Sequence, residues 1–270
     1  MIDWKLHAHN HELGIEEVQK LNNENKNFWG WANGMMICGT DDFIAMRFLK
    51  GFDYEPVTRH LWRELCKSSE IAVDVGTHSG VFTLDAWRAG AKNVLSVEPN
   101  PFNYSRLIVN LRKNNFRVDG TFYGAAGEVN GVDNLLIKGT LYKCYAAGRM
   151  GLHNQNGIEI PVKVARVDKL IPEKLWPGVG VVKIDAENWT PQVLKGMTGI
   201  LHFKPDLIVE CTNEGMEEIL KDHGYKYWRI WETGNIEEVE DLKPHNPGNN
   251  YNGTDENCRN RFCSVKGLPQ

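Results

Sequence analysis

IAVDVGTHSGVFTLDAWRAGAKNVLSVEPNP, residues 71–101, is the stretch of this sequence that decides its fold. An apolar run at residues 71–75 predicts a buried strand, and the glycine turn GTHSG at residues 76–80 follows it. A helix is expected over about residues 81–89, and residues 94–97 predict a second buried strand. Strand, helix and strand in this order make a βαβ unit, whose strands are parallel and whose crossover is right-handed.

A unit of this kind binds its ligand at the carboxyl ends of its strands. The helix after the turn, for which Ser79 is the expected N-cap, directs backbone N–H groups and the positive end of its dipole to that edge. Glu98 ends the second strand there, where a carboxylate can accept hydrogen bonds from both hydroxyls of a ribose. These features indicate a ligand that contains a ribose.

The spacing of the glycines separates the candidate ligands. A dinucleotide-binding turn, G-x-G-x-x-G, needs its second glycine so that backbone can approach the pyrophosphate, and His78 would obstruct that approach here. The Lys-Ser/Thr pair of a P-loop is also missing from the turn. The pattern D-x-G-x-x-x-G, from Asp74 to Gly80, instead looks like motif I of the class I methyltransferases, which bind S-adenosylmethionine. A plain structural turn is the alternative, and the acidic strand end with the following PNP sequence argues against it.

The bulk composition sets limits on the class of protein. The 270 residues suffice for one large α/β domain, and 41% hydrophobic and 24% charged residues are ordinary for a globular chain. A net charge of −4 without a long basic run disfavours tight nonspecific binding to nucleic acid. The start MIDWKLHAHN lacks the apolar core of a signal peptide, no run approaches a membrane span, and the six cysteines include no CxxC pair. We therefore expect a cytoplasmic protein with reduced thiols and no metal site.

A third strand is expected at residues 117–123, and it ends in small residues that include Ala125 and Ala126. A strand end without bulky side chains leaves room for a flat base, which makes it a candidate site for an adenine. A simple tight turn explains the same residues equally well.

A central strand is expected at residues 179–184, with two carboxylates, Asp185 and Glu187, at its exit. Such carboxylates can also cap helices or pair with lysines such as Lys183, which is the structural alternative. We favour a catalytic role, because ligands bind where parallel strands end.

The N-terminal part of the chain carries fewer signals. Residues 1–69 are expected to form an extension or cap packed on the core formed by residues 70–270. Within it, residues 35–38 and 43–45 are expected to pair as short strands. Trp29 and Trp31 are candidates for core packing or for stacking on a sugar, and residues 244–260 predict a long loop that helps to form the acceptor site.

Four segments together point to a family. DVGTHSGVFTL, VEPNP, VKIDAENWTPQVLKG and DLIVE, in this order and spacing, resemble the FkbM family of S-adenosylmethionine-dependent methyltransferases over about residues 45–230. The resemblance implies the α/β, Rossmann-like class I methyltransferase fold, with a seven-stranded and mostly parallel sheet. It also implies O-methyl transfer, often to sugars or sugar-bearing metabolites. The family usually has a glycine after K-I-D-V-E, and Asn188 followed by Trp189 makes this loop bulkier here.

The resemblance and the strand ends together define a candidate site. The methyl group of a sulfonium is already activated, so the protein has to align the acceptor oxygen and remove its proton. The expected catalytic residues are Asp185, Glu187 and Lys183. The residues expected to bind S-adenosylmethionine are Asp74, Gly76, Thr77, His78, Ser79, Gly80, Glu98, Pro99, Asn100, Ala125, Ala126 and Asp185.

The leading hypothesis is an O-methyltransferase that acts on a hydroxyl of a sugar, a glycan or a small metabolite. A 2′-O RNA methyltransferase using Asp185 and Glu210 with lysines is an alternative, and the acidic balance of the chain counts against it. An NAD-dependent oxidoreductase is disfavoured by His78 in the turn. A cofactor-binding protein without catalysis has only the altered loop at Asn188 and Trp189 in its support.

Overall fold

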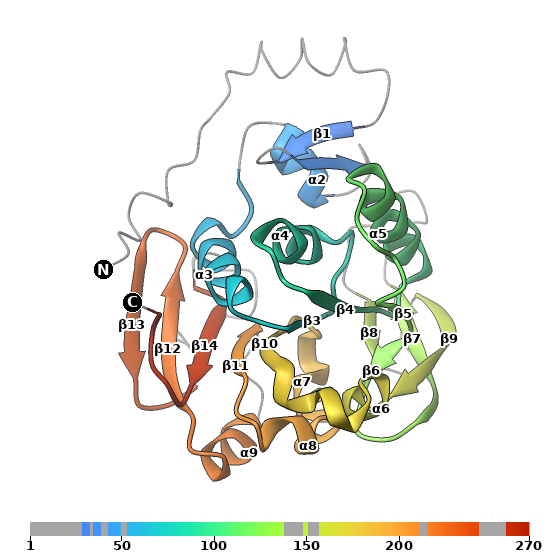
Figure 1. Ribbon diagram of the computed structural model, residues 1–270. Coiled ribbons are helices and arrows are strands. Elements are labelled where there is room, and N and C mark those ends of the chain that lie inside the picture. Colours follow the sequence, from blue (N-terminus) through green and yellow to red (C-terminus); the bar gives the residue numbers. More distant parts are fainter. Residues whose placement is uncertain are drawn as a thin grey trace.

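The computed structural model describes residues 29–32, 35–38, 43–49, 53–137, 148–150, 157–210, 215–242 and 258–269. In these residues a large central sheet carries helices on both of its faces, and a smaller sheet lies beside it (Figure 1). None of the helices in these ranges has the length and apolar composition needed to cross a membrane.

The central sheet has eight strands in the order β13-β12-β14-β11-β10-β3-β4-β5. The strands from β11 to β5 are parallel, whereas β14 runs antiparallel to β11 and β12, and β13 antiparallel to β12. The strands are β3 (Ile71–Val75), β4 (Asn93–Glu98), β5 (Thr121–Tyr123), β10 (Val179–Ile184), β11 (Asp206–Glu210), β12 (Lys226–Trp231), β13 (Asn235–Val239) and β14 (Asn260–Ser264).

The strand order explains where a ligand can bind. The chain runs from β3 through β4 to β5 in one direction and then returns to place β10 and β11 on the other side of β3. The order therefore reverses between β3 and β10, and a crevice opens at the carboxyl ends of the strands at such a reversal. The α/β, mostly parallel fold expected from the sequence is confirmed. The sheet has eight strands instead of seven, because β13 adds a hairpin partner to β12 at the edge.

Helices cover both faces of the sheet because each parallel crossover has to pass over one face. One face carries α3 (Pro56–Lys67), α4 (Val81–Ala89) and α5 (Pro101–Lys113), and the other carries α6 (Val167–Leu170), α7 (Thr190–Lys195), α8 (Thr198–Leu201) and α9 (Met216–Asp222) (Figure 1). The two short 3-10 helices are η2 (Glu173–Gly178) and η3 (Glu187–Trp189).

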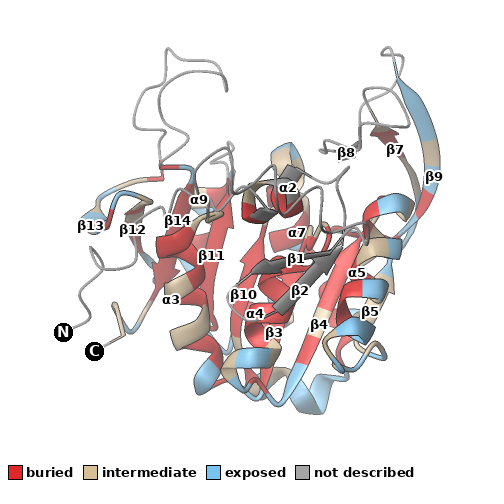
Figure 2. Cartoon of the chain, turned by 90° about the horizontal axis from the view of Figure 1, so that it is seen from above, coloured by how far each residue is buried: buried red, intermediate tan, exposed pale blue. Residues whose placement is uncertain are grey.

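Side chains alternate between the two apolar layers along each central strand. In β3, Val73 packs with the layer of α7, α8 and α9, and Ala72 packs with the layer of α3 and α4. In β11, Val209 and Ile208 alternate in the same way. All residues of β3 and β11 are therefore buried, and the two strands have no solvent-facing side (Figure 2).

The smaller sheet comes from the segment between β5 and α6. Its strands are β6 (Ala125–Ala126), β7 (Gly131–Ile137), β8 (Gly148–Met150) and β9 (Ile158–Ala165), in the order β6-β9-β7-β8. β7 and β9 form a long antiparallel ladder that projects beyond the main sheet (Figure 2). Its own apolar cluster includes Leu135, Met150 and Val162.

Three local expectations from the sequence are wrong. Residues 43–45 do not form a strand: they begin α2 (Phe43–Leu49), and β2 (Met35–Cys38) pairs instead with β1 (Trp29–Ala32). Ile44, Ala45 and Phe48 of α2 pack on α4 and α5, which favours the helix. The N-cap of α4 is Gly80, in the left-handed conformation, and not Ser79. The third strand, β5, is shorter than expected because residues 118–120 turn sharply before it.

Candidate active site

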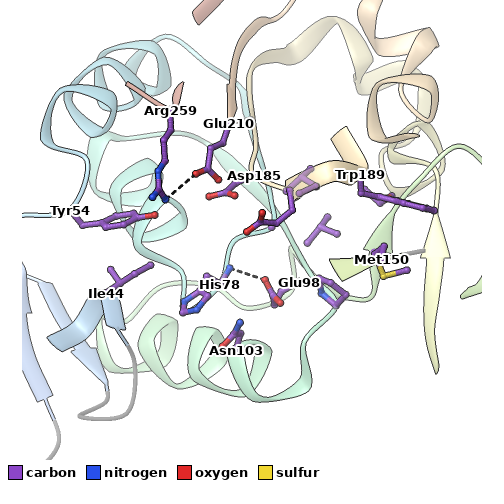
Figure 3. A pocket seen from close by; sticks show the side chains of 18 residues that line it. Ile44, Tyr54, His78, Glu98, Asn103, Met150, Asp185, Trp189, Glu210 and Arg259 are labelled. Atoms are coloured by element: carbon purple, nitrogen blue, oxygen red, sulfur yellow. Dashed lines mark hydrogen bonds and ion pairs between the residues drawn. The ribbon is translucent and has the colours of Figure 1, made fainter. Parts of the chain in front are cut away.

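A pocket of about 370 Å³ lies at the carboxyl ends of β3, β4, β10 and β11 (Figure 3). Its lining residues come from several separate elements of the chain. The turn after β3 and the end of β4 form one wall, and the exits of β10 and β11 form another. β6 contributes Ala125 and Ala126, and α5 and β8 contribute one residue each. Ile44 comes from α2, whereas Tyr54 and Arg259 lie just before α3 and β14. The pocket therefore collects residues from the whole length of the described chain.

The glycine turn is pressed against the exit of β10. Gly76 has a φ of 77°, and a Cβ added to it would lie 1.8 Å from the carbonyl oxygen of Asp185. The N–H of Asp185 in turn donates to the carbonyl of Val75 at 2.8 Å. Position 76 therefore requires glycine because the turn after β3 packs directly against the backbone at the exit of β10. The shape of the pocket depends on this packing.

Glu98 is oriented by two backbone donors. The N–H of His78 donates to Oε2 at 2.8 Å (Figure 3). The N–H of Asn100 donates to Oε1, also at 2.8 Å. Burial raises the pKa of Glu98 to about 7, although these two hydrogen bonds act to lower it. The carboxylate faces the pocket with its orientation fixed, and its remaining lone pairs can accept hydrogen bonds from a diol.

Asn103 lies on α5 beside Glu98 and lines the same wall (Figure 3). Its side chain is 2% exposed, and within the described residues its Oδ1 has no hydrogen-bond partner. A buried amide oxygen without a partner costs free energy, so this atom is suited to a ligand that donates a hydrogen bond.

Several expected cofactor residues lie behind the pocket wall and do not line it. Thr83 Oγ1 donates to Asp74 Oδ2 at 2.7 Å and lies 2.7 Å from Thr77 Oγ1. Ser79 is fully buried, and Asn110 donates to its carbonyl at 2.7 Å. These contacts hold the turn in shape. Gly80 and Asn100 are the other expected cofactor residues that do not line the pocket. The expected cofactor residues that do line it are Gly76, His78, Glu98, Pro99, Ala125, Ala126 and Asp185.

The wall opposite the turn is built around Trp189. Its Nε1–H donates to the carbonyl of Ala126 at 3.0 Å, which fixes the indole ring at the edge of the pocket beside Ala125. Asn188, which stands where the family has a glycine, is exposed. Of the two bulky replacements, Trp189 is the one that shapes the pocket.

Asp185 and Glu210 form an acidic pair at the exits of neighbouring strands. Burial by itself would raise the pKa of Asp185, but Lys183 and a hydrogen bond with Glu210 hold it below its usual value. Burial and the nearby Asp185 raise the pKa of Glu210 well above its usual value. The two shifts have opposite directions, so Glu210 is the member of the pair that holds a proton more readily.

Lys183 supports this pair from beneath. Its Nζ lies 3.1 Å from Asp185 Oδ2 and 4.3 Å from the centre of the Phe82 ring, and its side chain is buried. Burial acts to lower the pKa of Lys183, and Asp185 and Glu55 more than reverse the effect. Lys183 is thus a fixed positive charge behind Asp185, and it does not line the pocket.

Glu187 lines the pocket next to this pair and begins η3. Its φ of 52° is in the left-handed region, which residues with a side chain rarely adopt. Strain of this kind is most often found at functional sites.

The polar lining residues outside the expected catalytic and cofactor-binding sets are Tyr54, Asn103, Glu210 and Arg259, of which Glu210 was a candidate only for the alternative RNA methyltransferase. Glu210 carried a usable signal, because DLIVE ends a buried strand in the same way as the stretch that ends in Glu98. Tyr54 and Arg259 carried none, since their place depends on how α3 and β14 pack. The side chains of Trp29 and Trp31 and most of the loop at residues 244–260 lie outside the described residues. In the described ranges no three His, Cys, Asp or Glu residues come together in a way that could hold a metal ion.

Comparisons with known proteins add independent findings. Residues 74–227 match the family model described as the methyltransferase FkbM domain. The chain is 26% identical over 191 residues to the hexuronic acid methyltransferase AglP of Haloferax volcanii, across 67% of this chain and 71% of that protein. Among solved structures, it is similar to the precorrin-6y C5,15-methyltransferase of Geobacter metallireducens GS-15, with 13% identity, 77% and 89% coverage of the two chains and a TM-score of 0.42. It is also similar to M. jannaschii TYW2 in complex with AdoMet, with 11% identity, 87% and 83% coverage and a TM-score of 0.42.

Proposed function

The chain belongs to the FkbM family of methyltransferases, and from that premise we propose that it transfers a methyl group from S-adenosylmethionine to an oxygen of a sugar or sugar-bearing acceptor. The observation that carries the proposal is the pocket itself. On one wall, Glu98 is oriented to accept hydrogen bonds from the hydroxyls of a ribose. On the other wall lies the carboxyl pair of Asp185 and Glu210.

The residues of the pocket fit the proposed cofactor. Glu98 would accept the ribose hydroxyls, and the buried Oδ1 of Asn103 is suited to a further donor on the ligand. The small side chains of Ala125 and Ala126 leave room for the adenine. When bound, the cofactor supplies an electrophilic methyl group and leaves as a neutral thioether.

Asp185 is the residue we propose for the acceptor oxygen. Its pKa is below the usual value, so it is a weak base towards an ordinary hydroxyl, and it serves first to accept the hydroxyl hydrogen bond. The acceptor oxygen becomes strongly acidic as its new bond to carbon forms, and its proton can then pass to an Oδ of Asp185. The raised pKa of Glu210 makes it the carboxyl that holds a proton more readily, and Lys183 fixes the Asp185 carboxylate from behind.

A sugar acceptor is supported by a relative and by the pocket wall. The similar protein from Haloferax volcanii is named a hexuronic acid methyltransferase. In this chain the indole of Trp189, held by the carbonyl of Ala126, offers a rigid apolar surface at the pocket edge against which a sugar ring could pack.

The proposal is tested by incubating the protein with S-adenosylmethionine and a panel of uronic acids, neutral hexoses and their glycosides. We expect a methylated sugar and S-adenosylhomocysteine in equal amounts by mass spectrometry. Asp185→Asn should lower turnover by about 10²–10⁴-fold and leave cofactor affinity nearly unchanged. Absence of methyl transfer to every member of the panel, or full turnover by Asp185→Asn, contradicts the acceptor or the role of Asp185 respectively.

A further inference from the structure

Helix α5 presents one buried face to the rest of the protein. Its buried residues recur every three to four positions, which places them on one side of the helix: Asn103, Leu107, Asn110 and Leu111. This face lies on the glycine turn after β3. A Cβ added to Gly80 would come within 2.6 Å of Leu107 Cδ1. Asn103 is one turn before Leu107, which brings it to the pocket that it lines.

The two asparagines of this face have different surroundings. Asn110 is fully buried, and its Nδ2 donates to the carbonyl of Ser79 at 2.7 Å. Asn103 is also buried, but its Oδ1 has no hydrogen-bond partner among the described residues. The fold therefore uses the amide of Asn110 to hold the turn and leaves the amide oxygen of Asn103 unpaired.

An unpaired amide oxygen in a buried position has a cost. It has lost its contacts with water and gained no partner, which destabilises the folded protein. An apolar side chain of similar shape, such as leucine, avoids this cost. A ligand that pairs with the amide removes the cost when it binds. A residue of this kind lowers the stability of the free protein and strengthens binding, which is typical of functional sites.

The position of Asn103 indicates which part of a ligand it meets. The N–H of Asn100 donates to Glu98 Oε1, and Asn100 is also the N-cap of α5, so the first turn of the helix is fixed beside this carboxylate. Figure 3 shows Asn103 on α5, on the same side of the pocket as Glu98 and His78. The ligand group that meets Asn103 is therefore next to the group that meets Glu98.

Hydroxyl groups match both of these side chains. An ionised carboxylate can only accept hydrogen bonds, so a hydroxyl that donates to Glu98 keeps lone pairs that need a donor in a buried site. The amide of Asn103 has an oxygen and an NH₂ group, and rotation about its last side-chain bond exchanges their positions. It can therefore accept from one hydroxyl or donate to another. A carboxylate and an amide on one wall suit two adjacent hydroxyls better than a carboxylate alone.

We propose that Asn103 is a specificity-determining residue that pairs with a ribose hydroxyl of the cofactor, beside the contact made by Glu98. The inference rests on the proposed function, because the ribose is that of S-adenosylmethionine. It adds a second residue to ribose recognition, carried by α5 and not by the end of β4. It also assigns a cost in stability to the ligand-free protein, which a purely structural asparagine does not have.

The first part of the test measures stability without ligand in matched leucine variants. Asn103→Leu removes a buried oxygen that has no partner, so this variant should melt at the same temperature as the wild type or higher. Asn110→Leu is the control on the same helix face. It leaves the carbonyl of Ser79 without its donor, so it should melt at a lower temperature than the wild type.

The second part measures binding of S-adenosylhomocysteine and of its 2′-deoxy and 3′-deoxy analogues by calorimetry. Asn103→Leu should weaken S-adenosylhomocysteine by roughly three- to tenfold, the loss expected for one hydrogen bond. The analogue that lacks the paired hydroxyl should bind this variant and the wild type almost equally, and the other analogue should be weakened like S-adenosylhomocysteine. Asn110→Leu should leave the ratios among the three ligands unchanged. Asn103→Ala repeats the comparison without the bulk of leucine.

A lower melting temperature for ligand-free Asn103→Leu would show that the amide stabilises the fold, and it overturns the proposal. Unchanged affinity for S-adenosylhomocysteine, or equal weakening of all three ligands in both variants of Asn103, overturns the contact with the ribose. A failure of the proposed function gives a different result, because the wild type itself then binds neither S-adenosylmethionine nor S-adenosylhomocysteine.

Discussion

Glu98 is the residue on which the proposed cofactor binding depends most. Its carboxylate already accepts one backbone hydrogen bond on each oxygen, so it can meet a ribose without rearrangement. Glu98→Ala should weaken S-adenosylhomocysteine binding by about 1.5–3 kcal/mol, the value for hydrogen bonds to a charged group. Calorimetry on the two proteins measures the difference, and unchanged affinity would show that the ribose is held elsewhere.

The pKa of about 7 for Glu98 also predicts a pH dependence. Ribose hydroxyls donate to the ionised carboxylate, so binding favours the form that has lost its proton. Affinity should be constant above about pH 7 and fall by up to about tenfold for each pH unit below it. Glu98→Gln removes the titrating group, and its weaker binding should not follow this curve. A wild-type curve that is flat down to about pH 5 contradicts the assignment.

Gly76 separates a structural from a ligand-binding requirement. A side chain at this position overlaps the backbone of Asp185, so Gly76→Ala should destabilise the fold by about 4 kcal/mol or more. Gly90 is the matched control, since it is also left-handed but has nothing within 4 Å of an added Cβ, and Gly90→Ala should cost only about 1–2 kcal/mol. Chemical denaturation measures both. Equal losses would show that the contact with Asp185 is not decisive.

At the residue scale, the sequence predicted the strand exits well and the rest of the pocket poorly. Glu98, Asp185 and Glu187 could be found because buried parallel strands bring their last residues to one edge. Tyr54 and Arg259 could not be found in this way. Their positions follow from a long-range hydrogen bond between Glu55 and Asn260, and nothing in the local sequence indicates such a pairing.

At the scale of elements, α3 and α4 are joined by a buried ion pair. Arg59 Nε lies 2.6 Å from Asp85 Oδ2, and both side chains are almost fully buried. Asp85→Asn leaves the guanidinium with one fewer buried partner and should destabilise the protein by about 3–5 kcal/mol. Asp119→Asn, in an exposed pair with Arg117, should change stability little by comparison. Denaturation curves that shift equally for both variants contradict this reading of the α3–α4 contact.

Elements with a strong apolar period were predicted well, and those set by tertiary contacts were not. β3, α4 and β4 follow their local sequence closely. The short helix α2 was expected to be a strand, because FIA is apolar without a period that distinguishes the two. Its packing on Leu84, Leu107 and neighbouring residues decides for the helix. The edge strand β13 was missed because NIEEV is polar and forms only as the hairpin partner of β12.

At the scale of the whole molecule, we propose that residues 1–69 act as a cap on the methyltransferase core of residues 70–270. α2 packs on α4 and α5, and Ile44 reaches the pocket. Deletion of residues 1–50 should lower the melting temperature and reduce methyl transfer more than cofactor affinity. Phe48→Ala removes packing without removing a pocket residue. It should lower stability and leave the ratio of the methyl-transfer rate to the cofactor affinity unchanged. A truncated protein with full activity on its acceptor contradicts the role of the cap in the site.

The central claim is that the pocket between β3, β4 and β10 takes S-adenosylmethionine. Cofactor binding tests it most directly, because the measurement does not depend on knowing the acceptor. Calorimetric titration of the wild-type protein with S-adenosylmethionine and, separately, with NAD should give saturable one-to-one binding of the methyl donor and no heat with NAD. Tight binding of NAD with no response to S-adenosylmethionine would contradict the account.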